Sequence, residues 1–378
     1  MTHVFIVNER TFNIHLQYMF AGTGYKGNDL SCIIDLKKSG STEKTLTGMI
    51  ADISKLRIGD KVLFYVTGCK KIFGVFEVAG LPFYESFTDN NNYLYDTLGK
   101  NLTFRVLIKP SLVFASGISE QEALDEIHDI EHPYQMCWSL IYRKLSGMRG
   151  CSFLTDYESE RIIGLISKKN NGKNIQSTAY KYDFKSKSIT ANDQVLTYSG
   201  DCSKTLDVIN RICDITNSFE VHLQAYITQN YDKKKDLKTI LDSEKTFWIG
   251  NEVVCSVGEQ RIDVMMISKS DDNIIIRIIE LKDGKPYADI ILSQIPWYIK
   301  WVDQYVAPNY SENVVIKPII IAAEFRRKSN TQKAFLEEKR RFNLNLPTNY
   351  NSTVAELEYI SFSIDKDKET ISFFKTSY

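Results

Sequence analysis

The sequence Arg261-Ile-Asp-Val-Met-Met-Ile-Ser-Lys-Ser-Asp-Asp-Asn-Ile-Ile-Ile-Arg-Ile-Ile-Glu-Leu-Lys282 contains two apolar runs on either side of a polar segment. The apolar runs are Val264–Ile267 and Ile274–Ile279, and both are rich in residues that favour strands. The segment between them, Ser268–Asn273, holds Ser, Lys, Asp and Asn, which are typical of turns. The stretch therefore predicts a β-hairpin.

The predicted hairpin brings three charged residues to one end of a sheet. Asp263 opens the first strand, and Glu280 and Lys282 lie near the end of the second. Side chains alternate along a strand, so Glu280 and Lys282 share a face while Leu281 points into the core. We therefore expect two carboxylates and an ammonium to converge on one point.

This trio is suited to metal-dependent hydrolysis of a phosphodiester. Asp263 and Glu280 offer the hard oxygen ligands that Mg²⁺ prefers, and Mn²⁺ can take its place. Lys282 is suited to position or deprotonate the attacking water and to offset charge on the phosphorus centre. The alternative interpretation is that the two carboxylates are ordinary charges at strand ends, with Lys282 as their salt-bridge partner.

Segments on both sides of the hairpin add candidate residues. Residues 219–227 carry apolar side chains at helical spacing, and Glu220 lies at the edge of that apolar stripe. Residues 288–302 form another apolar-periodic segment, with Gln294 and Tyr298 four residues apart on one helical face.

The order of these motifs resembles the PD-(D/E)XK nuclease superfamily, and most closely the catalytic domain of the NucS endonucleases. The matching positions, over residues 206–378, are Glu220, Arg261-Ile-Asp263, Glu280-Leu-Lys282 and Gln294 with Tyr298. The resemblance implies a DNA endonuclease whose metal ligands are Asp263 and Glu280 and whose catalytic residues also include Glu220, Lys282 and Gln294. Pro296 departs from the pattern, because proline belongs in the first turn of a helix and strains its interior.

The N-terminal part predicts a small, strongly twisted β-barrel or sheet surrounded by helices. Its strand-like runs are residues 3–7, 62–66, 72–78 and 103–109, and Pro110 ends the last of them. Over residues 1–170 the sequence resembles the EVE and YTH-like domains of the PUA superfamily. The matching phrases are Phe5-Ile-Val-Asn-Glu9, Gly59-Asp-Lys-Val-Leu-Phe-Tyr-Val-Thr-Gly68, Phe73-Gly-Val-Phe-Glu-Val78 and Phe104-Arg-Val-Leu-Ile-Lys-Pro110.

That resemblance implies a pocket that receives a flipped, modified base between aromatic side chains. The candidate base-binding residues are Asn8, Phe20, Tyr25, Tyr65 and Tyr84. Tyr25 lies in a glycine-rich loop, and Tyr65 points to the sheet face opposite to that of Phe64. Asn8 follows the first strand and suits either a base edge or a simple turn.

Composition is consistent with two domains and a cytoplasmic protein. The 378 residues include 47 Lys+Arg and 47 Asp+Glu, so any nucleic-acid surface must be local. Seven cysteines without Cys-x-x-Cys spacing fit free thiols in a reducing compartment, and no signal peptide or membrane-spanning run is predicted. Residues 171–205 are rich in Asn, Lys and Ser and predict a linker with a small hairpin.

The expected architecture combines α+β and α/β parts. A PUA-like twisted β-barrel with helices at 1–170 precedes a mixed sheet flanked by helices at 206–378. The expected function is a modification-dependent restriction endonuclease that acts on double-stranded DNA, as a homodimer for double-strand cleavage, in defence against modified phage DNA. Alternatives are a restriction enzyme for an unmodified sequence, a mismatch or branched-DNA repair nuclease, and a non-catalytic nucleic-acid-binding protein.

Overall fold

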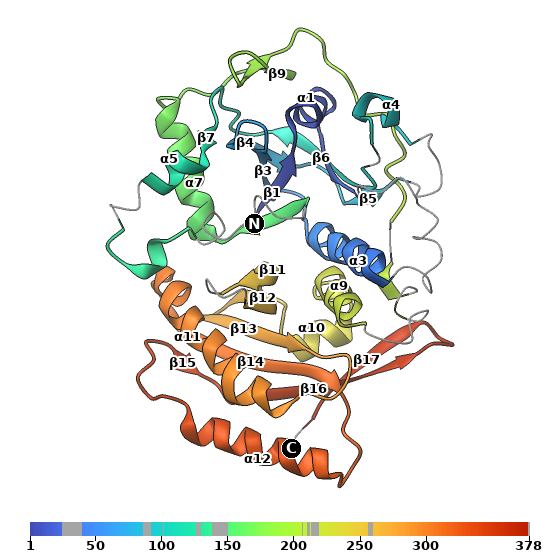
Figure 1. Cartoon of the computed structure of the whole chain (residues 1–378), viewed down its shortest axis with the longest axis vertical. Coiled ribbons are helices and arrows are strands. Elements are labelled where there is room, and N and C mark those ends of the chain that lie inside the picture. Colours follow the sequence, from blue (N-terminus) through green and yellow to red (C-terminus); the bar gives the residue numbers. More distant parts are fainter. Residues whose placement is uncertain are drawn as a thin grey trace. The chain divides into compact units, whose positions relative to one another are not determined.

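The computed structural model divides the chain into two compact units (Figure 1). Unit 1 comprises Met1–Glu131 and Met136–Leu206, and unit 2 comprises His132–Gln135 and Asp207–Tyr378. The structure describes residues 1–24, 40–85, 92–100, 102–125, 130–137, 150–205, 207–209, 212, 219–255 and 260–376. Tyr25 lies outside the described residues.

Unit 1 is built on a curled mixed sheet with the strand order β2-β6-β4-β3-β1-β8. Its strands are β1 (Thr2–Val7), β2 (Phe20–Thr23), β3 (Lys61–Val66), β4 (Lys71–Val78), β5 (Phe83–Tyr84), β6 (Phe104–Pro110), β7 (Ile118–Ser119) and β8 (Cys151–Leu154). Strands β1 and β3 are parallel. Strand β6 joins the two halves of the sheet, because one end of it pairs with β2 and the other end pairs with β4. Within the described residues β2 and β8 do not pair, so the expected barrel is an open half-barrel.

The described helices of unit 1 are α1 (Glu9–Tyr18), α3 (Gly40–Ser54), α4 (Tyr95–Leu98), α5 (Glu120–Asp125) and α7 (Asp156–Lys169). Helix α7 begins with a capping box, in which the side chains of Thr155 and Glu158 each accept the other residue's backbone N–H. Ile162 and Ile166 of this helix pack in a core cluster with Tyr65 and Leu63 of β3.

The segment predicted as a linker at 171–205 belongs to unit 1. It forms the expected small hairpin, β9 (Tyr180–Asp183) with β10 (Ser188–Ala191), and this hairpin packs on α1. The ring of Tyr182 lies 5.3 Å from that of Phe12, and its backbone N–H donates to the side chain of Asn13 at 2.9 Å. The segment is polar in composition, but its buried tyrosines fix it to the unit.

Unit 2 contains the expected mixed sheet flanked by helices, with the order β11-β12-β13-β14-β16-β17. Its strands are β11 (Thr246–Val254), β12 (Arg261–Ser270), β13 (Asn273–Leu281), β14 (Asn313–Ala323), β15 (Thr353–Val354), β16 (Glu358–Asp365) and β17 (Thr370–Lys375). The helical elements are η2 (Pro133–Gln135), α9 (Glu220–Asn230), α10 (Lys235–Leu241), η3 (Ile290–Gln294), α11 (Ile295–Tyr305), η4 (Ala307–Asn309) and α12 (Asn330–Asn345). Helix α9 packs on β11–β13, and α11 packs on β13 and β14 (Figure 1).

Strand β13 is central in this sheet and is buried from Ile274 to Leu281. A strand covered on both faces is usually a continuous apolar run, and β13 departs from this at Glu280 and at Arg277. Its guanidinium donates to the hydroxyl of Ser268 and to the backbone carbonyl and carboxylate of Asp242, the latter two both at 2.8 Å. The buried charge is therefore paired, as a charge in an apolar core must be.

No helix in the described part of the chain has both the length and the apolar character that crossing a bilayer requires.

Candidate active site

The hairpin β12–β13 sets Asp263 opposite Glu280. The strands are antiparallel, and Val264 pairs with Ile279. Continuing this register by one residue in each strand places Asp263 opposite Glu280. The pairing continues to Ser270 and Asn273, which makes the turn shorter than the polar segment predicted from the sequence. The carboxylate of Asp263 accepts a 2.7 Å hydrogen bond from the backbone N–H of Leu281, which fixes it at the end of the sheet.

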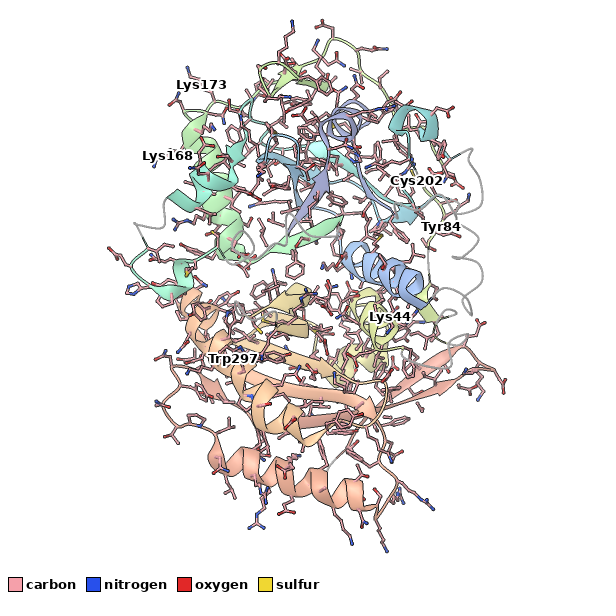
Figure 2. All side chains as sticks on the ribbon, in the orientation of Figure 1. Lys44, Tyr84, Lys168, Lys173, Cys202 and Trp297 are labelled. Carbon is pink, nitrogen blue, oxygen red and sulfur yellow. The ribbon has the colours of Figure 1, made fainter. Side chains whose placement is uncertain are left out.

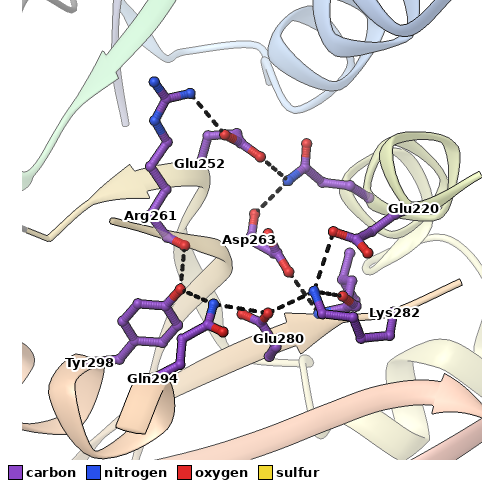
Figure 3. A network of polar contacts seen from close by, with 10 residues as sticks. Glu220, Glu252, Arg261, Asp263, Glu280, Lys282, Gln294 and Tyr298 are labelled. Atoms are coloured by element: carbon purple, nitrogen blue, oxygen red, sulfur yellow. Dashed lines mark hydrogen bonds and ion pairs between the residues drawn. The ribbon is translucent and has the colours of Figure 1, made fainter. Parts of the chain in front are cut away.

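Lys282 places its ammonium among three oxygen atoms (Figure 3). Its Nζ lies 2.8 Å from Oε1 of Glu280 and 3.4 Å from Oε1 of Glu220, and it donates to the carbonyl of Leu281 at 2.7 Å. The backbone N–H of Lys282 donates to the carbonyl of Ile321 in β14 at 2.9 Å, which anchors the residue just beyond the strand.

Glu280 is the most enclosed carboxylate of the group, with 1% of its surface exposed. Its Oε1 accepts from Lys282 and, at 3.0 Å, from Nε2 of Gln294. Its Oε2 is buried and has no hydrogen-bond partner. A buried carboxylate oxygen without a partner is costly, so this atom marks a position where a cation or donor would be favourable.

Gln294 reaches Glu280 because of a local break in the helix that carries it. The five residues of η3 form a π-helical turn, and α11 follows with Pro296 in its first turn. Proline is tolerated there because its missing N–H has no intrahelical partner in any case. Gln294 and Tyr298 therefore stay on one face; the amide of Gln294 donates to the hydroxyl of Tyr298, which donates to the carbonyl of Arg261 at 2.7 Å.

Glu220 enters the group from the first turn of α9, on a different element from the hairpin. Its contact is the 3.4 Å ion pair with Lys282, and it is partly exposed. Burial raises the pKa of Glu220 above the usual carboxyl value, although Lys282 acts in the opposite direction. Glu220 is thus linked to Glu280 by the ammonium of Lys282, which contacts both carboxylates.

Crowding of negative charge shifts the pKa values of this group. Burial and the neighbouring carboxylate of Glu280 raise the pKa of Asp263 well above its usual value, and burial likewise raises that of Glu280. Burial by itself would lower the pKa of Lys282, but Glu280 and Asp263 raise it. The raised pKa favours the ammonium form of Lys282, which suits charge stabilisation.

A further layer of polar residues, which sequence reasoning missed, supports Asp263. The amide of Gln224 donates to the carbonyl of Asp263 at 2.9 Å and to Oε1 of Glu252 at 3.1 Å. The other oxygen of Glu252 pairs with Arg261 at 3.1 Å. Gln224 follows Glu220 by four residues on one helix, and that spacing was a usable signal, because residues i and i+4 share a face.

The donor set was compared with what a hard divalent cation needs. Among the described residues, no three side chains of His, Cys, Asp and Glu gather as a metal-binding group. Mg²⁺, however, is commonly held by one or two carboxylates together with water and substrate phosphates. Asp263 and Glu280 are two adjacent carboxylates with an unpartnered buried oxygen between α9 and α11, so their chemistry fits such an ion.

Most of the predicted base-binding residues of unit 1 have structural roles. The side chain of Asn8 accepts from the backbone N–H of Thr11 and caps helix α1, so the turn interpretation is correct. Tyr65 is 2% exposed and donates to Glu120 at 2.6 Å. Phe20 is fully buried, with its ring 4.5 Å from that of His15.

Tyr84, labelled in Figure 2, is a predicted base-binding residue that stays partly exposed, and the next residue, Glu85, belongs to a buried polar cluster. In that cluster Arg105 donates to the hydroxyl of Tyr198 at 2.9 Å, and this hydroxyl donates to Glu85 at 2.8 Å. Nη2 of Arg105 is buried without a hydrogen-bond partner. The sequence did not reveal this cluster, because its members come from segments far apart in the chain.

Comparisons with known proteins give limited information. No family model matches the sequence, and no curated protein matches it. Three solved structures are similar to part of this chain: a hypothetical protein from Leishmania major (14% identity, TM-score 0.29, 44% of this chain and 95% of that one), a Pseudomonas syringae protein (11%, 0.28, 44% and 99%), and human THYN1 in complex with 5-methylcytosine-containing DNA (12%, 0.26, 43% and 96%). Similarity of this extent carries no argument about the fold or the function of this chain.

Proposed function

We propose that unit 2 hydrolyses DNA phosphodiester bonds with the help of a divalent cation held by Asp263 and Glu280. The observation that carries this proposal is the buried, unpartnered Oε2 of Glu280 beside Asp263 and the Lys282 ammonium. A purely structural ion pair would be expected to satisfy both oxygens of a carboxylate that is 1% exposed. The resemblance of the motifs to the PD-(D/E)XK superfamily supports the same chemistry.

Each residue of the group has a role in this proposal. A bound Mg²⁺ would supply Lewis-acid charge at the scissile phosphate. Lys282 would stabilise negative charge on the phosphate oxygens, since its raised pKa keeps it protonated. Glu220 would orient the attacking water from behind the metal ligands, and the proton of that water would pass to solvent. Water oxygen bonds to phosphorus, the opposite P–O bond breaks, and the leaving oxygen takes a proton from solvent.

Gln294 and Tyr298 would position Glu280 and would not react themselves. The amide of Gln294 donates to Oε1 of Glu280, which leaves Oε2 directed toward the proposed metal. The hydroxyl of Tyr298 connects this amide to the backbone of β12, so the two carboxylate-bearing strands and α11 are held together.

For unit 1 we propose the reading of a modified base, so that the whole chain is a modification-dependent restriction endonuclease. This part is supported by the resemblance of residues 1–170 to the EVE and YTH-like domains. Tyr84 remains a candidate for stacking, beside the Arg105, Glu85 and Tyr198 cluster, and Tyr25 remains a candidate outside the described residues. Because one such catalytic site cuts one strand, cleavage of both strands would require two copies of the chain.

The experiment is cleavage of matched duplexes that are unmodified, contain methylcytosine, hydroxymethylcytosine or methyladenine, or contain a mismatch. We expect the wild-type protein to cut a modified duplex with Mg²⁺ and Glu280→Ala to cut none. Glu312→Gln is the control, because its ion pair with Lys269 lies at the other end of the hairpin. Preference for a mismatch would favour a repair nuclease, and preference for unmodified DNA would favour an ordinary restriction enzyme. Cutting by Glu280→Ala at the wild-type rate would refute the proposed site.

A further inference from the structure

Two clefts of unit 2 meet at Trp297, beside the carboxylate group. The first, of about 690 Å³, is lined by Gln260, Arg261, Ser293, Gln294, Trp297 and Tyr298. The second, of about 370 Å³, lies between α11 and α12, and Ser293 and Trp297 line it as well. The indole of Trp297 is therefore a wall shared by both clefts.

The exposure of Trp297 is unusual within its own helix. Trp297 is 45% exposed, whereas Trp301, one turn further along α11, is 5% exposed and belongs to the core. A single exposed apolar residue on a surface needs no special explanation. Here, however, the exposed ring lines a cleft, and the rest of that cleft is mostly polar. Figure 2 labels the position of Trp297 on α11.

Gln294 connects the cleft at Trp297 to the carboxylate group. Gln294 lines the first cleft and donates to Oε1 of Glu280 at 3.0 Å. Residues three apart on a helix have Cβ atoms about 5–6 Å apart, so Trp297 follows Gln294 on the same side of the helix. A phosphate bound at Glu280 and Lys282 would thus have its neighbouring nucleoside close to the Trp297 ring.

We propose that Trp297 stacks on an unpaired nucleobase of the strand that is cut, next to the scissile phosphate. This inference rests on the proposed nuclease function and adds a determinant of its substrate. Base stacking on an aromatic side chain needs one free π-face, which a base inside a duplex does not present. The strand would therefore be locally unpaired at the site of cleavage.

Charge at the clefts agrees with a nucleic-acid strand as the occupant. Arg261 lines the first cleft and Lys300 the second, so a cation stands on each side of Trp297. Arg261 is held by Glu252 and remains partly exposed. A strand with its base on Trp297 has phosphates on both sides of that base, and these two cations are placed to meet them.

The test uses the full chain with Asp263→Asn, so that binding is measured without cleavage. Three proteins are compared: Asp263→Asn alone, Asp263→Asn with Trp297→Phe, and Asp263→Asn with Trp301→Phe. For each, we measure how far tryptophan fluorescence is quenched by a single-stranded oligonucleotide and by a duplex with a single-stranded flap. We expect the quench to be lost with Trp297→Phe and retained with Trp301→Phe, its control on the same helix. With Trp297→Ala, affinity for the flap duplex should fall roughly 5- to 150-fold, as loss of one stacked base predicts.

Abasic oligonucleotides make the test specific for stacking. One abasic position should weaken binding to Trp297-containing protein and have no further effect on Trp297→Ala. Equal quenching in all proteins, or an abasic effect that persists in Trp297→Ala, would overturn the stacking proposal. If stacking behaves as expected and the wild type cuts no DNA, the base site stands and the nuclease proposal falls. If the wild type and Trp297→Ala cut and bind alike, the nuclease stands and the stacking proposal falls.

Discussion

Asp263 and Glu280 are held close together by the hairpin although both carry negative charge when ionised. Burial raises the pKa of each carboxyl, repulsion by Glu280 raises that of Asp263 further, and Lys282 offsets this only in part. When ionised, such buried carboxylates lower the stability of the folded state, and a bound cation would restore that stability. The residues that make the site are thus expected to weaken the fold when no metal is present.

This predicts that Asp263→Asn stabilises the protein in metal-free buffer at pH 8. Since the folded-state pKa of Asp263 is raised, the folded state binds more protons than the unfolded state above about pH 4, and stability falls as pH rises through that pKa. Removing the charge should raise the free energy of unfolding by roughly 1 kcal/mol or more at pH 8, and less at pH 5. Urea denaturation with EDTA at the two pH values measures this. The same difference at both pH values would contradict the assigned shift, and Glu312→Gln, which removes a carboxylate outside the group, is the control.

Glu220 contacts the group through Lys282. We therefore expect its substitution to slow cleavage less than substitution of a metal ligand does. We expect Glu220→Gln to slow cleavage about 10- to 100-fold, the usual size of effects from residues behind the ligands. Asp263→Ala should remove measurable cleavage under the same conditions. Single-turnover rates at limiting Mg²⁺ compare the two variants. A wild-type rate for Glu220→Gln would place this residue outside the site.

At the residue scale, the sequence predicted that the hairpin end would bring charged residues together, but it did not predict that Phe20 and Tyr65 would be buried. Strand alternation and a short turn are local, and they suffice to bring Asp263, Glu280 and Lys282 together. Tyr65 and Phe64 point to opposite faces of β3, as the sequence predicted. Helix α7 covers the face that carries Tyr65, so the tyrosine is buried as well. Coverage of a sheet by a distant helix is not visible in the pattern of one strand.

Among the elements, η3 and α11 show how a proline shapes the site. The sequence left open whether Pro296 strains a helix interior or marks a first turn, and the structure places it in the first turn of α11, after a π-helical turn that the sequence did not predict. The consequence is that Tyr298 links Gln294 to the backbone of Arg261. This link crosses from a helix to a strand and could not be inferred from either element separately.

Tyr298→Phe tests that link. The change leaves the carbonyl of Arg261 and the amide of Gln294 without a hydroxyl partner, which should cost about 1–3 kcal/mol of stability. Because Gln294 would then hold Glu280 less firmly, we also expect cleavage to slow about 10-fold. Urea denaturation and single-turnover cleavage measure the two effects. Tyr287→Phe, at an exposed tyrosine, should change neither, and an unaltered Tyr298→Phe would remove the positioning role.

The β9–β10 hairpin gives a second prediction at the scale of elements. Tyr182 packs on Phe12 and its hydroxyl contacts Glu9, so Tyr182→Ala should destabilise unit 1 by about 3–5 kcal/mol. A fragment of residues 1–170 should accordingly be less stable than one of residues 1–205. Thermal unfolding followed by circular dichroism compares them. Equal stability of the two fragments would mean that 171–205 is a linker after all.

For the whole molecule, the sequence predicted mixed α+β organisation and the change of unit near residue 206, where the structure also divides the chain. It did not predict that His132–Gln135 would belong to unit 2, nor that the polar segment 171–205 would pack on unit 1. Both depend on contacts between residues far apart in the chain, which local patterns of hydrophobicity do not encode.

The division of labour between the units predicts that discrimination among bases and cleavage can be separated. Glu280→Ala protein should bind a modified duplex better than an unmodified one by about 10- to 200-fold, the range for one methyl group in a fitted pocket. The salt dependence should be the same for both duplexes, because phosphate contacts carry the ionic part of binding. Titrations at two salt concentrations measure this, and Tyr84→Ala should reduce the difference. Equal affinity for all duplexes would leave unit 1 as an ordinary DNA-binding domain.

The most direct test of the central claim is strand cleavage as a function of Mg²⁺ concentration, under single-turnover conditions with a duplex that the wild type cuts. The claim predicts a rate that rises and saturates with Mg²⁺ for the wild type and for Glu312→Gln. It predicts no cleavage at any Mg²⁺ concentration for Asp263→Ala and Glu280→Ala that remain folded and bind DNA. Metal-dependent cleavage by either carboxylate variant at the wild-type rate would contradict the assignment of these residues as the centre of a nuclease.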